Sequence, residues 1–310
     1  MSGRKILAAL IFLLLTGCAP LPAPTPPPPS ATLAPPATST PLAPPTLRPT
    51  YTLEPSATPP PSITPRPFSQ EKQRFTFQTE DGRTLVGYFY PAAQINRPVI
   101  VLMHQNRADQ TLWNAEDSGF IAWLQNFPVA ADAPPATPSA RGLLPTLPAD
   151  LTYNVFTFDF RGHGESGGDP AQDFSEFILD ARAAYQFAAA LPYVNSQKIL
   201  GIGTSIGADA VVDGCGSLCA GAFSISPGSY LGQEYGATVS ALLQAGKPIR
   251  CMYANNDGPS PATCWSVAPS DLYKIFSYPG NKHGMTFFVP RKMEADFGQN
   301  IYDWIRKATE

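Results

Sequence analysis

The sequence lacks a cluster of basic residues and an apolar run long enough to span a bilayer. Its 310 residues include 21 Lys or Arg and 24 Asp or Glu, which gives a net charge of −3. Nucleic-acid binding needs basic side chains gathered on one face, so no nucleic acid is expected as a partner. The apolar run at the N-terminus, Ile6 to Leu15, is much shorter than the ~20 residues of a transmembrane helix. A permanent membrane span is therefore not expected.

Metal-binding patterns are also missing from the sequence. The chain has five cysteines and three histidines, and no cysteine stands with a histidine at zinc-finger spacing. We therefore expect neither a structural metal nor a cofactor. There is no internal repeat.

The first 17 residues are typical of an export signal. Arg4 and Lys5 precede the apolar run, and Leu15-Thr16-Gly17-Cys18 follows it. This tetrapeptide resembles the bacterial lipobox, in which the cysteine is lipidated and becomes the first residue of the mature protein. We therefore expect a lipid on Cys18 and an exported protein anchored to the outer face of the cell membrane. The alternative is an ordinary secretory signal with an incidental cysteine.

Residues 18–68 have the composition of a tether. From Pro20 to Pro67 the chain is almost entirely Pro, Thr, Ser, Ala and Leu, and it carries only three charged residues. Such a segment cannot bury a core and favours extended polyproline conformations. The folded domain is therefore predicted to comprise residues 69–310.

Hydrophobic periodicity in the domain predicts an α/β fold. Residues 74–79 and 85–90 alternate around a turn at 80–83, which indicates an antiparallel hairpin. Short apolar runs typical of buried parallel strands follow at 99–103, 154–158, 198–202, 220–225, 249–254 and 273–278. Helices are predicted at 115–126, 174–191 and 293–307. We expect a mostly parallel sheet with helices on both faces.

A Pro- and Ala-rich connection at 128–151 interrupts this alternation. Long loops without regular structure are uncommon in compact domains and are often functional. Two interpretations stay open for this segment, a partial cover over the site or a passive surface insertion.

The pentapeptide Gly203-Thr204-Ser205-Ile206-Gly207 is the strongest chemical signal in the chain. It directly follows the strand at 198–202 and precedes a helix candidate. A nucleophile elbow needs this context, because its serine occupies a tight strand-to-helix turn that glycines must flank. A phosphate-binding loop is disfavoured, since no lysine follows at the position that such a loop requires. We therefore predict Ser205 as a nucleophile.

A serine hydroxyl needs a base close by to act as a nucleophile at neutral pH. After an elbow of this kind the chain order is nucleophile, acid, histidine, and His283 is the only histidine beyond Ser205. His283 follows the last predicted strand and is expected to be the base. His104 and His163 are interpreted as structural or pocket-lining residues.

The supporting acid should lie in a loop between Ser205 and His283. Asp257 directly follows the strand at 249–254 and is the candidate. Three other carboxylates are interpreted as solvated or capping groups: Asp209, Asp213 and Asp271.

Backbone N–H groups must meet the negative charge of the tetrahedral intermediate. One is expected from Ile206, the residue after the nucleophile. The second is expected from the loop after the strand at 99–103, from Asn106 or, alternatively, Gln105.

Four cysteines remain once Cys18 is set aside, an even number that suits two disulfides in an exported protein. We expect Cys215 to pair with Cys219, across a flexible turn, and Cys251 to pair with Cys264, around the candidate acid. A competing pairing joins Cys219 to Cys251.

Together these motifs resemble the α/β-hydrolase superfamily over about residues 74–307. The chain is similar to dienelactone-hydrolase-like and esterase-like bacterial members, which have Ser-Pro-Gly where this chain has Ser226-Pro227-Gly228. His104-Gln105 departs from the His-Gly of many relatives. The resemblance implies acyl chemistry on esters, thioesters, lactones or amides. Since nothing like a propeller or large cap precedes the domain in this sequence, cleavage of a small ester through an acyl-enzyme is the leading interpretation. The alternatives are a peptidase, amidase or thioesterase with the same triad, and a non-catalytic binding protein on a hydrolase scaffold.

Overall fold

The computed structural model of the chain describes residues 69–114, 119–127, 143–168 and 174–310. These residues belong to the second of two units into which the chain divides, Thr64–Glu310. The expected signal, Cys18 and the tether lie outside the described residues, as does most of the 128–151 connection.

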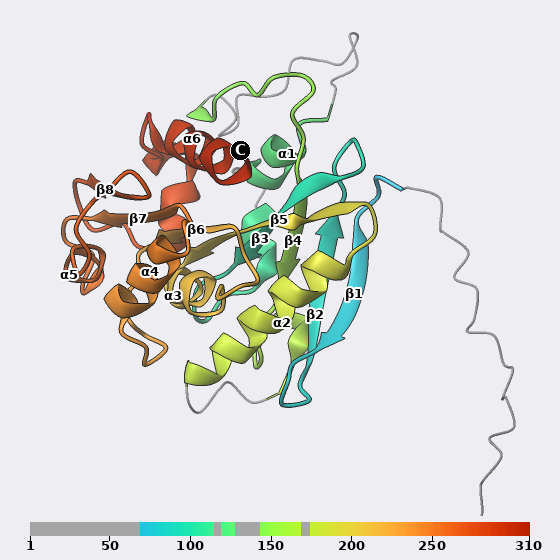
Figure 1. The fold of residues 1–310 in the computed structure, drawn as a ribbon, viewed down its shortest axis with the longest axis horizontal. Coiled ribbons are helices and arrows are strands. Elements are labelled where there is room, and N and C mark those ends of the chain that lie inside the picture. Colours follow the sequence, from blue (N-terminus) through green and yellow to red (C-terminus); the bar gives the residue numbers. More distant parts are fainter. Residues whose placement is uncertain (1–68, 115–118, 128–142, 169–173) are drawn as a thin grey trace, which may run out of the picture. The chain divides into compact units, whose positions relative to one another are not determined.

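A sheet of eight strands forms the centre of the domain (Figure 1). The strand order is β1-β2-β4-β3-β5-β6-β7-β8. β2 pairs antiparallel with both β1 and β4, and every other pairing is parallel. The strands are β1 Gln73–Gln78, β2 Thr84–Tyr90, β3 Arg97–Met103, β4 Asn154–Phe158, β5 Val194–Thr204, β6 Gly221–Ile225, β7 Ile249–Ala254 and β8 Tyr273–Tyr278.

Helices cover both faces of this sheet, with α1 and α6 on one side and α2, α3 and α4 on the other (Figure 1). The α-helices are α1 Phe120–Gln125, α2 Phe177–Ala190, α3 Ile206–Asp213, α4 Tyr235–Gln244, α5 Ser260–Cys264 and α6 Phe297–Thr309. Short 3-10 helices are η1 Gln110–Asn114, η3 Gly164–Ser166, η4 Phe174–Glu176, η5 Gly284–Phe288 and η6 Pro290–Lys292. The architecture is that of the α/β-hydrolase fold, which confirms the predicted fold class.

Every strand except the edge strand β1 contributes to two separate cores, because successive side chains point to opposite faces. In β7, Cys251 and Tyr253 belong to the core beneath α2, α3 and α4. Met252 and Ala254 belong to the core beneath α1 and α6. Burial on both faces explains why these strands are continuous apolar runs and not alternating patterns.

Several element boundaries differ from the predictions by a few residues. β5 begins at Val194 because its first residues pair with Arg97 beyond an irregularity in the β3–β5 register. The last helix begins at Phe297 and not at 293, because Met293 is extended with ψ near 135°. The predicted helix at 115–126 is described only as α1, and residues 115–118 lie outside the described residues.

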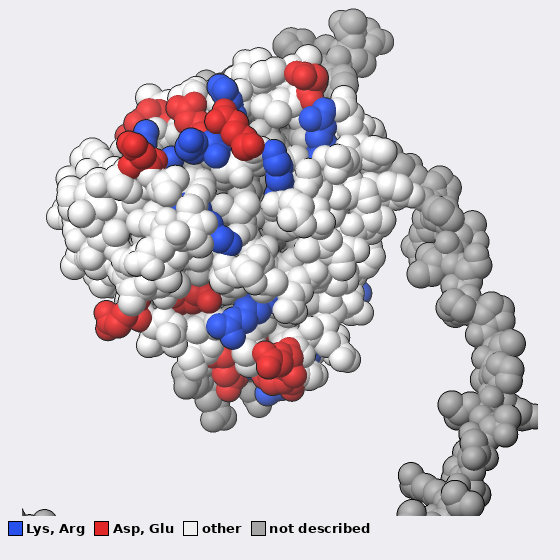
Figure 2. All heavy atoms as spheres, in the orientation of Figure 1, with Lys and Arg blue, Asp and Glu red and all other residues white. Residues whose placement is uncertain are grey.

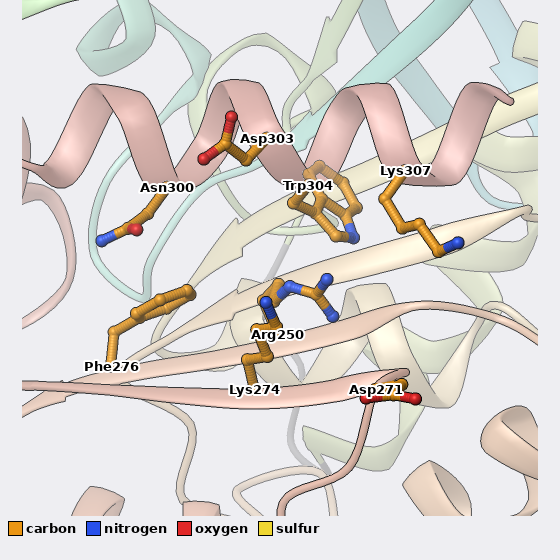
Figure 3. A pocket seen from close by; sticks show the side chains of 8 residues that line it. All are labelled: Arg250, Asp271, Lys274, Phe276, Asn300, Asp303, Trp304 and Lys307. Carbon is orange, nitrogen blue, oxygen red and sulfur yellow. The ribbon is translucent and has the colours of Figure 1, made fainter.

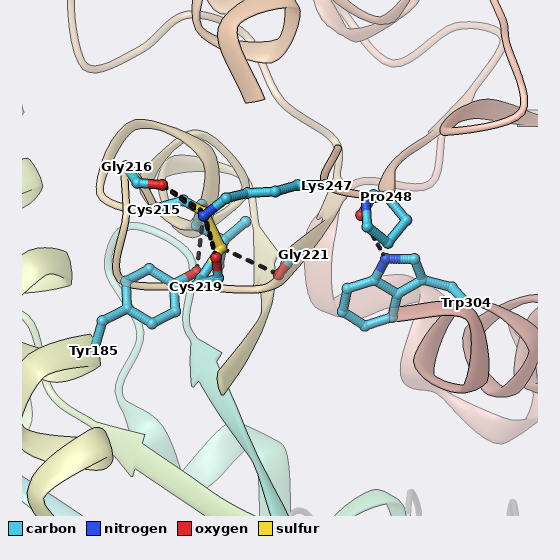
Figure 4. Close-up of a disulfide and its surroundings, with 9 residues drawn as sticks. Tyr185, Cys215, Gly216, Cys219, Gly221, Lys247, Pro248 and Trp304 are labelled. Carbon is cyan, nitrogen blue, oxygen red and sulfur yellow. Dashed lines mark hydrogen bonds between the residues drawn. A yellow bond between two sulfur atoms is a disulfide. The ribbon is translucent and has the colours of Figure 1, made fainter. Parts of the chain in front are cut away.

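Two disulfides join the four remaining cysteines, in the pairs expected from the sequence. Cys215 pairs with Cys219 at the end of α3, and Cys251 on β7 pairs with Cys264 on α5. The first bridge is covered by Lys247, whose ammonium donates to the carbonyls of Gly216 and Cys219 (Figure 4). The second encloses the loop that carries Asp257.

Loss of the Cys251–Cys264 disulfide is expected to destabilise the domain. Replacing Cys251 and Cys264 together by alanine should lower the free energy of unfolding by about 3 kcal/mol, because the bridge closes a long loop in the unfolded chain. The matched control replaces Cys215 and Cys219, only 4 positions apart, and should cost less, about 2 kcal/mol. Chemical denaturation measures both. A Cys251/Cys264 variant as stable as the wild type would contradict this account.

Candidate active site

Ser205 occupies a strained turn between β5 and α3. Its backbone has φ 55° and ψ −119°, a region that a residue with a side chain rarely adopts. The turn is tight because α3 approaches the sheet closely. A Cβ on Gly203 would overlap the carbonyl of Gly207, and a Cβ on Gly207 would overlap the carbonyl of Met103. Both glycines are therefore required by packing, and the geometry is that of a nucleophile elbow.

Asp257 and His283 meet at the same edge of the sheet as Ser205. They follow β7 and β8, and Ser205 follows β5, so all three lie at the carboxyl ends of parallel strands. His283 Nδ1 lies 2.6 Å from Asp257 Oδ1. An ionised carboxylate can only accept, so the bond places a proton on Nδ1 and leaves Nε2 free to act as a base.

The hydrogen bond from His283 is the one that the Asp257 carboxylate receives from the described residues. Asp257 is 5% exposed, and its second oxygen, Oδ2, has no hydrogen-bond partner among the described residues. His283 is more open, with 39% of its side chain exposed. Within the described part of the chain the Ser205 hydroxyl forms no hydrogen bond with His283. Such contacts are often loose without substrate and tighten in the complex.

His104 orients the loop that is expected to supply an oxyanion donor. It is fully buried, and burial lowers its pKa to about 4, so it is neutral near pH 7. Its Nε2 accepts from the N–H of Phe160 at 3.1 Å. The proton therefore resides on Nδ1, which donates to the carbonyl of Gln105 at 2.8 Å. Because the peptide is trans and planar, the N–H of Asn106 points away from His104.

The second expected donor is the N–H of Ile206, the first residue of α3. The first N–H groups of a helix have no intrahelical partner, so this group is available for an anion. Gly207 packs on the carbonyls of Met103 and His104, so the elbow is in contact with the loop that carries Asn106.

His163 also contacts this loop, and its ring lies next to that of His104. Its Nε2 accepts from the N–H of Arg107 and lies 3.2 Å from Asn106 Oδ1. Its Nδ1 lies 3.0 Å from the carbonyl of Arg161. These contacts fit a structural role, and among the described residues His163 has no carboxylate partner of the kind that His283 has.

Arg161 holds the segment that carries His163. It is 4% exposed and forms ion pairs with three carboxylates, of Asp81, Glu176 and Asp180. Asp180 is completely buried, so removal of Arg161 would leave an unpaired carboxyl in the core. No local pattern in the sequence around Arg161 indicates these distant partners.

Two side chains fix the backbone after His283, a role that the sequence did not predict for either of them. Ser226, at the end of β6, accepts from the N–H of Gly284 at 2.9 Å. Gln105 Oε1, at the end of β3, accepts from the N–H of Met285 at 2.9 Å. β3 and β6 are the two neighbours of β5 in the sheet. The histidine loop is therefore attached on both sides of the nucleophile strand.

The three carboxylates interpreted as solvated or capping groups differ in the structure. Asp271 is exposed. Asp213 is 8% exposed, and Asp209 is completely buried, where it accepts from the N–H groups of Gly228 and Tyr230. Burial raises the pKa of Asp209 to about 7 and that of Asp213 to about 6. The expectation of solvation was wrong for these two because α3 packs directly against the sheet.

Charged side chains of both signs are mixed on the surface, and the described residues form no metal site. On the face drawn in Figure 2, acidic and basic side chains are interspersed and form no patch of one sign. Among the described residues, no group of three or more His, Cys, Asp or Glu is placed to hold a metal ion. In that same part of the chain, no helix has the length and apolar character needed to cross a membrane.

Similarity to known proteins is clearest at the level of the fold. The Pyrococcus furiosus esterase Pf2001 superposes with a TM-score of 0.52 at 17% identity, covering 76% of this chain and 92% of that one. The α/β hydrolase GrgF from a Penicillium species superposes with a TM-score of 0.52 at 14% identity, covering 77% and 99%. At these identities the likeness shows the fold alone, and it confirms the α/β-hydrolase architecture.

Sequence relatives cover only part of the chain. The uncharacterized protein YfhR of Salmonella typhi is 26% identical over 156 residues, or 48% of this chain and 42% of the relative. YfhR of Escherichia coli K12 is 26% identical over 152 residues, or 47% and 42%. The chain thus aligns with less than half the length of these relatives. No model of a known protein family matches it.

Loss of the Gln105 side chain is expected to reduce catalysis more than stability. Gln105→Ala removes the acceptor of the Met285 N–H but keeps the loop backbone, so His283 becomes less precisely placed. We expect kcat on a soluble ester to fall about 10- to 100-fold, with a stability loss of about 1 kcal/mol.

The control is Gln70→Ala, which deletes an exposed amide bonded to the carbonyl of Ala93. Steady-state kinetics and thermal melting compare the two variants. If kcat of Gln105→Ala is unchanged, Gln105 does not position His283. The same holds if kcat falls only in proportion to the fraction of the variant that is unfolded.

Proposed function

We propose that this chain is a serine hydrolase that cleaves carboxylic esters through an acyl-enzyme. The observation that carries the proposal is the hydrogen bond between His283 and the buried Asp257, at the sheet edge where Ser205 occupies its strained turn. A histidine with a purely structural role in the core would not need both a buried carboxylate partner on one ring nitrogen and a second ring nitrogen that is left free.

In the proposed reaction, Ser205 Oγ attacks the ester carbonyl carbon while His283 Nε2 takes the hydroxyl proton. The carbonyl oxygen becomes an oxyanion that the N–H groups of Ile206 and Asn106 stabilise. As the intermediate collapses, the bond to the alcohol oxygen breaks and His283 donates its proton to that oxygen. Asp257 stabilises the imidazolium throughout.

Water completes the cycle by the same chemistry in reverse order. His283 takes a proton from water, the hydroxide oxygen attacks the acyl carbon, and the bond to Ser205 Oγ breaks. Ser205 recovers its proton from His283, and the carboxylic acid leaves. No cofactor enters any step.

The same residues suit amide or thioester cleavage, so the substrate class is decided by comparison of leaving groups. An ester, a thioester and an amide that share one acyl group should be hydrolysed with the ester or thioester ahead of the amide. Hydrolysis of the amide alone would favour a peptidase or amidase. Reversible binding of all three without turnover would favour a non-catalytic binding protein.

Substitution at the triad should abolish hydrolysis without unfolding the domain. Ser205→Ala and His283→Ala are each expected to reduce kcat about 10⁴-fold or more, since nucleophile and base act as one unit. His163→Ala is the matched histidine control and should lose much less, because the hydrogen bonds of His163 go to Asn106, Arg107 and Arg161 and none of those in the described part of the chain joins it to Asp257. Equal losses at His163 and His283, with intact circular dichroism, would overturn the assignment of the base.

The proposal for localisation rests on the sequence. We propose that Cys18 carries lipid and holds the mature protein at the outer face of the cell membrane, with the tether of residues 18–68 between lipid and enzyme. Cys18→Ser should therefore release the protein from membranes or block its processing. Membrane fractionation and mass spectrometry of the N-terminus test this. Recovery of a membrane-bound protein with unmodified Cys18 would contradict it.

A further inference from the structure

A pocket of about 260 Å³ lies at the opposite ends of the strands from Ser205, between α6 and strands β7 and β8 (Figure 3). Its deepest charged residue is Arg250, the second residue of β7. In the sheet register Arg250 pairs with Phe223 on one side and with Lys274 on the other. Its side chain therefore projects from the face of the sheet that α6 covers.

Arg250 carries a buried charge without a protein counter-ion. It is 4% exposed, and within the described part of the chain it forms no ion pair. Its Nη1 donates to the carbonyls of Ile249 and Leu272, at 2.9 Å each. Nε and Nη2 have no acceptor among the described residues, and neither is among the sealed core atoms that lack a partner. These donors are therefore open to the pocket.

An unpaired buried guanidinium is unusual, because a charge that leaves water loses its solvation and normally gains an anion in return. Burial lowers the pKa of Arg250 to about 10, which still leaves it protonated near pH 7. Arg161 in the same protein shows the usual solution, with three carboxylates around one guanidinium. The Arg250 site offers the same fork of donors with no carboxylate bonded to it.

The pocket walls select the kind of anion. Arg250 and Lys307 both line the pocket, and Lys307 reaches down from α6 towards the strands to one side of Arg250, whereas Asp303 points away from the strands (Figure 3). Trp304 donates its indole N–H to the carbonyl of Pro248, so its ring offers only apolar surface. Phe276 adds a second aromatic wall.

We propose that this pocket binds a small organic carboxylate, with its oxygens on Arg250 and Lys307 and its carbon chain against Phe276 and Trp304. A carboxylate matches the planar fork of an arginine. The volume limits the ligand to a few carbon atoms or one ring. Asp271 and Asp303 at the margin disfavour a phosphate dianion of higher charge.

Isothermal titration of the full chain at fixed ionic strength tests the proposal. The probes are butyrate and benzoate, with butyramide as the neutral isostere and inorganic phosphate as the alternative anion. We expect saturable binding of at least one carboxylate, and no saturable binding of butyramide or phosphate in the same range. The binding is independent of the proposed esterase activity, so Ser205→Ala should bind equally well.

Pocket variants locate the site. Arg250→Met keeps the aliphatic stem and should weaken carboxylate binding at least 10-fold, and Lys307→Met should weaken it several-fold. Lys292→Met makes the same charge change at an exposed residue outside the pocket and should have no effect. If Arg250→Met fails to fold, the carboxylate affinity of Lys307→Met decides whether the ligand binds in this pocket.

Any of three results would overturn the proposal. These are no saturable binding to the wild type in the millimolar range, equal binding of phosphate or butyramide, and binding that the folded pocket variants leave unchanged.

Discussion

The close approach of α3 to the sheet is the constraint on which the site depends. Because Gly207 rests against the carbonyls of Met103 and His104, the chain must reverse direction at Ser205 within a single residue. That reversal forces Ser205 into its positive φ and presents its side chain at the sheet edge. The same contact brings the N–H of Ile206 next to the loop that carries Asn106. One backbone contact therefore positions the expected nucleophile and both expected oxyanion donors.

Side chains from neighbouring strands hold the rest of the site in register with this turn. His104 and His163, whose rings lie side by side, both hold the loop after β3. Ser226 and Gln105 attach the backbone after His283 to the strands that flank β5. Each bond alone contributes about 1 kcal/mol. Together they restrict His283 and Asn106 relative to Ser205, which is what preorganised acyl chemistry requires.

The sequence predicted the parts of this arrangement that depend on local pattern. Apolar runs gave the strands, and the two glycines around Ser205 gave the elbow, since each reflects a steric demand within a few residues. The attachment of Met285 to Gln105 spans 180 positions along the chain, and no local pattern signals it. The burial of Asp209 was missed for a similar reason, because its partners Gly228 and Tyr230 lie beyond the next strand.

Fluorophosphonate labelling followed by peptide mapping tests the central claim most directly. The reagent phosphonylates only a serine that a nearby base activates and an oxyanion site accepts, so it reports on the whole arrangement in one reaction. The account predicts a single modified residue, Ser205, and loss of labelling in the folded His283→Ala variant. A folded wild-type chain that stays unlabelled, or that carries the label on another residue, would contradict it.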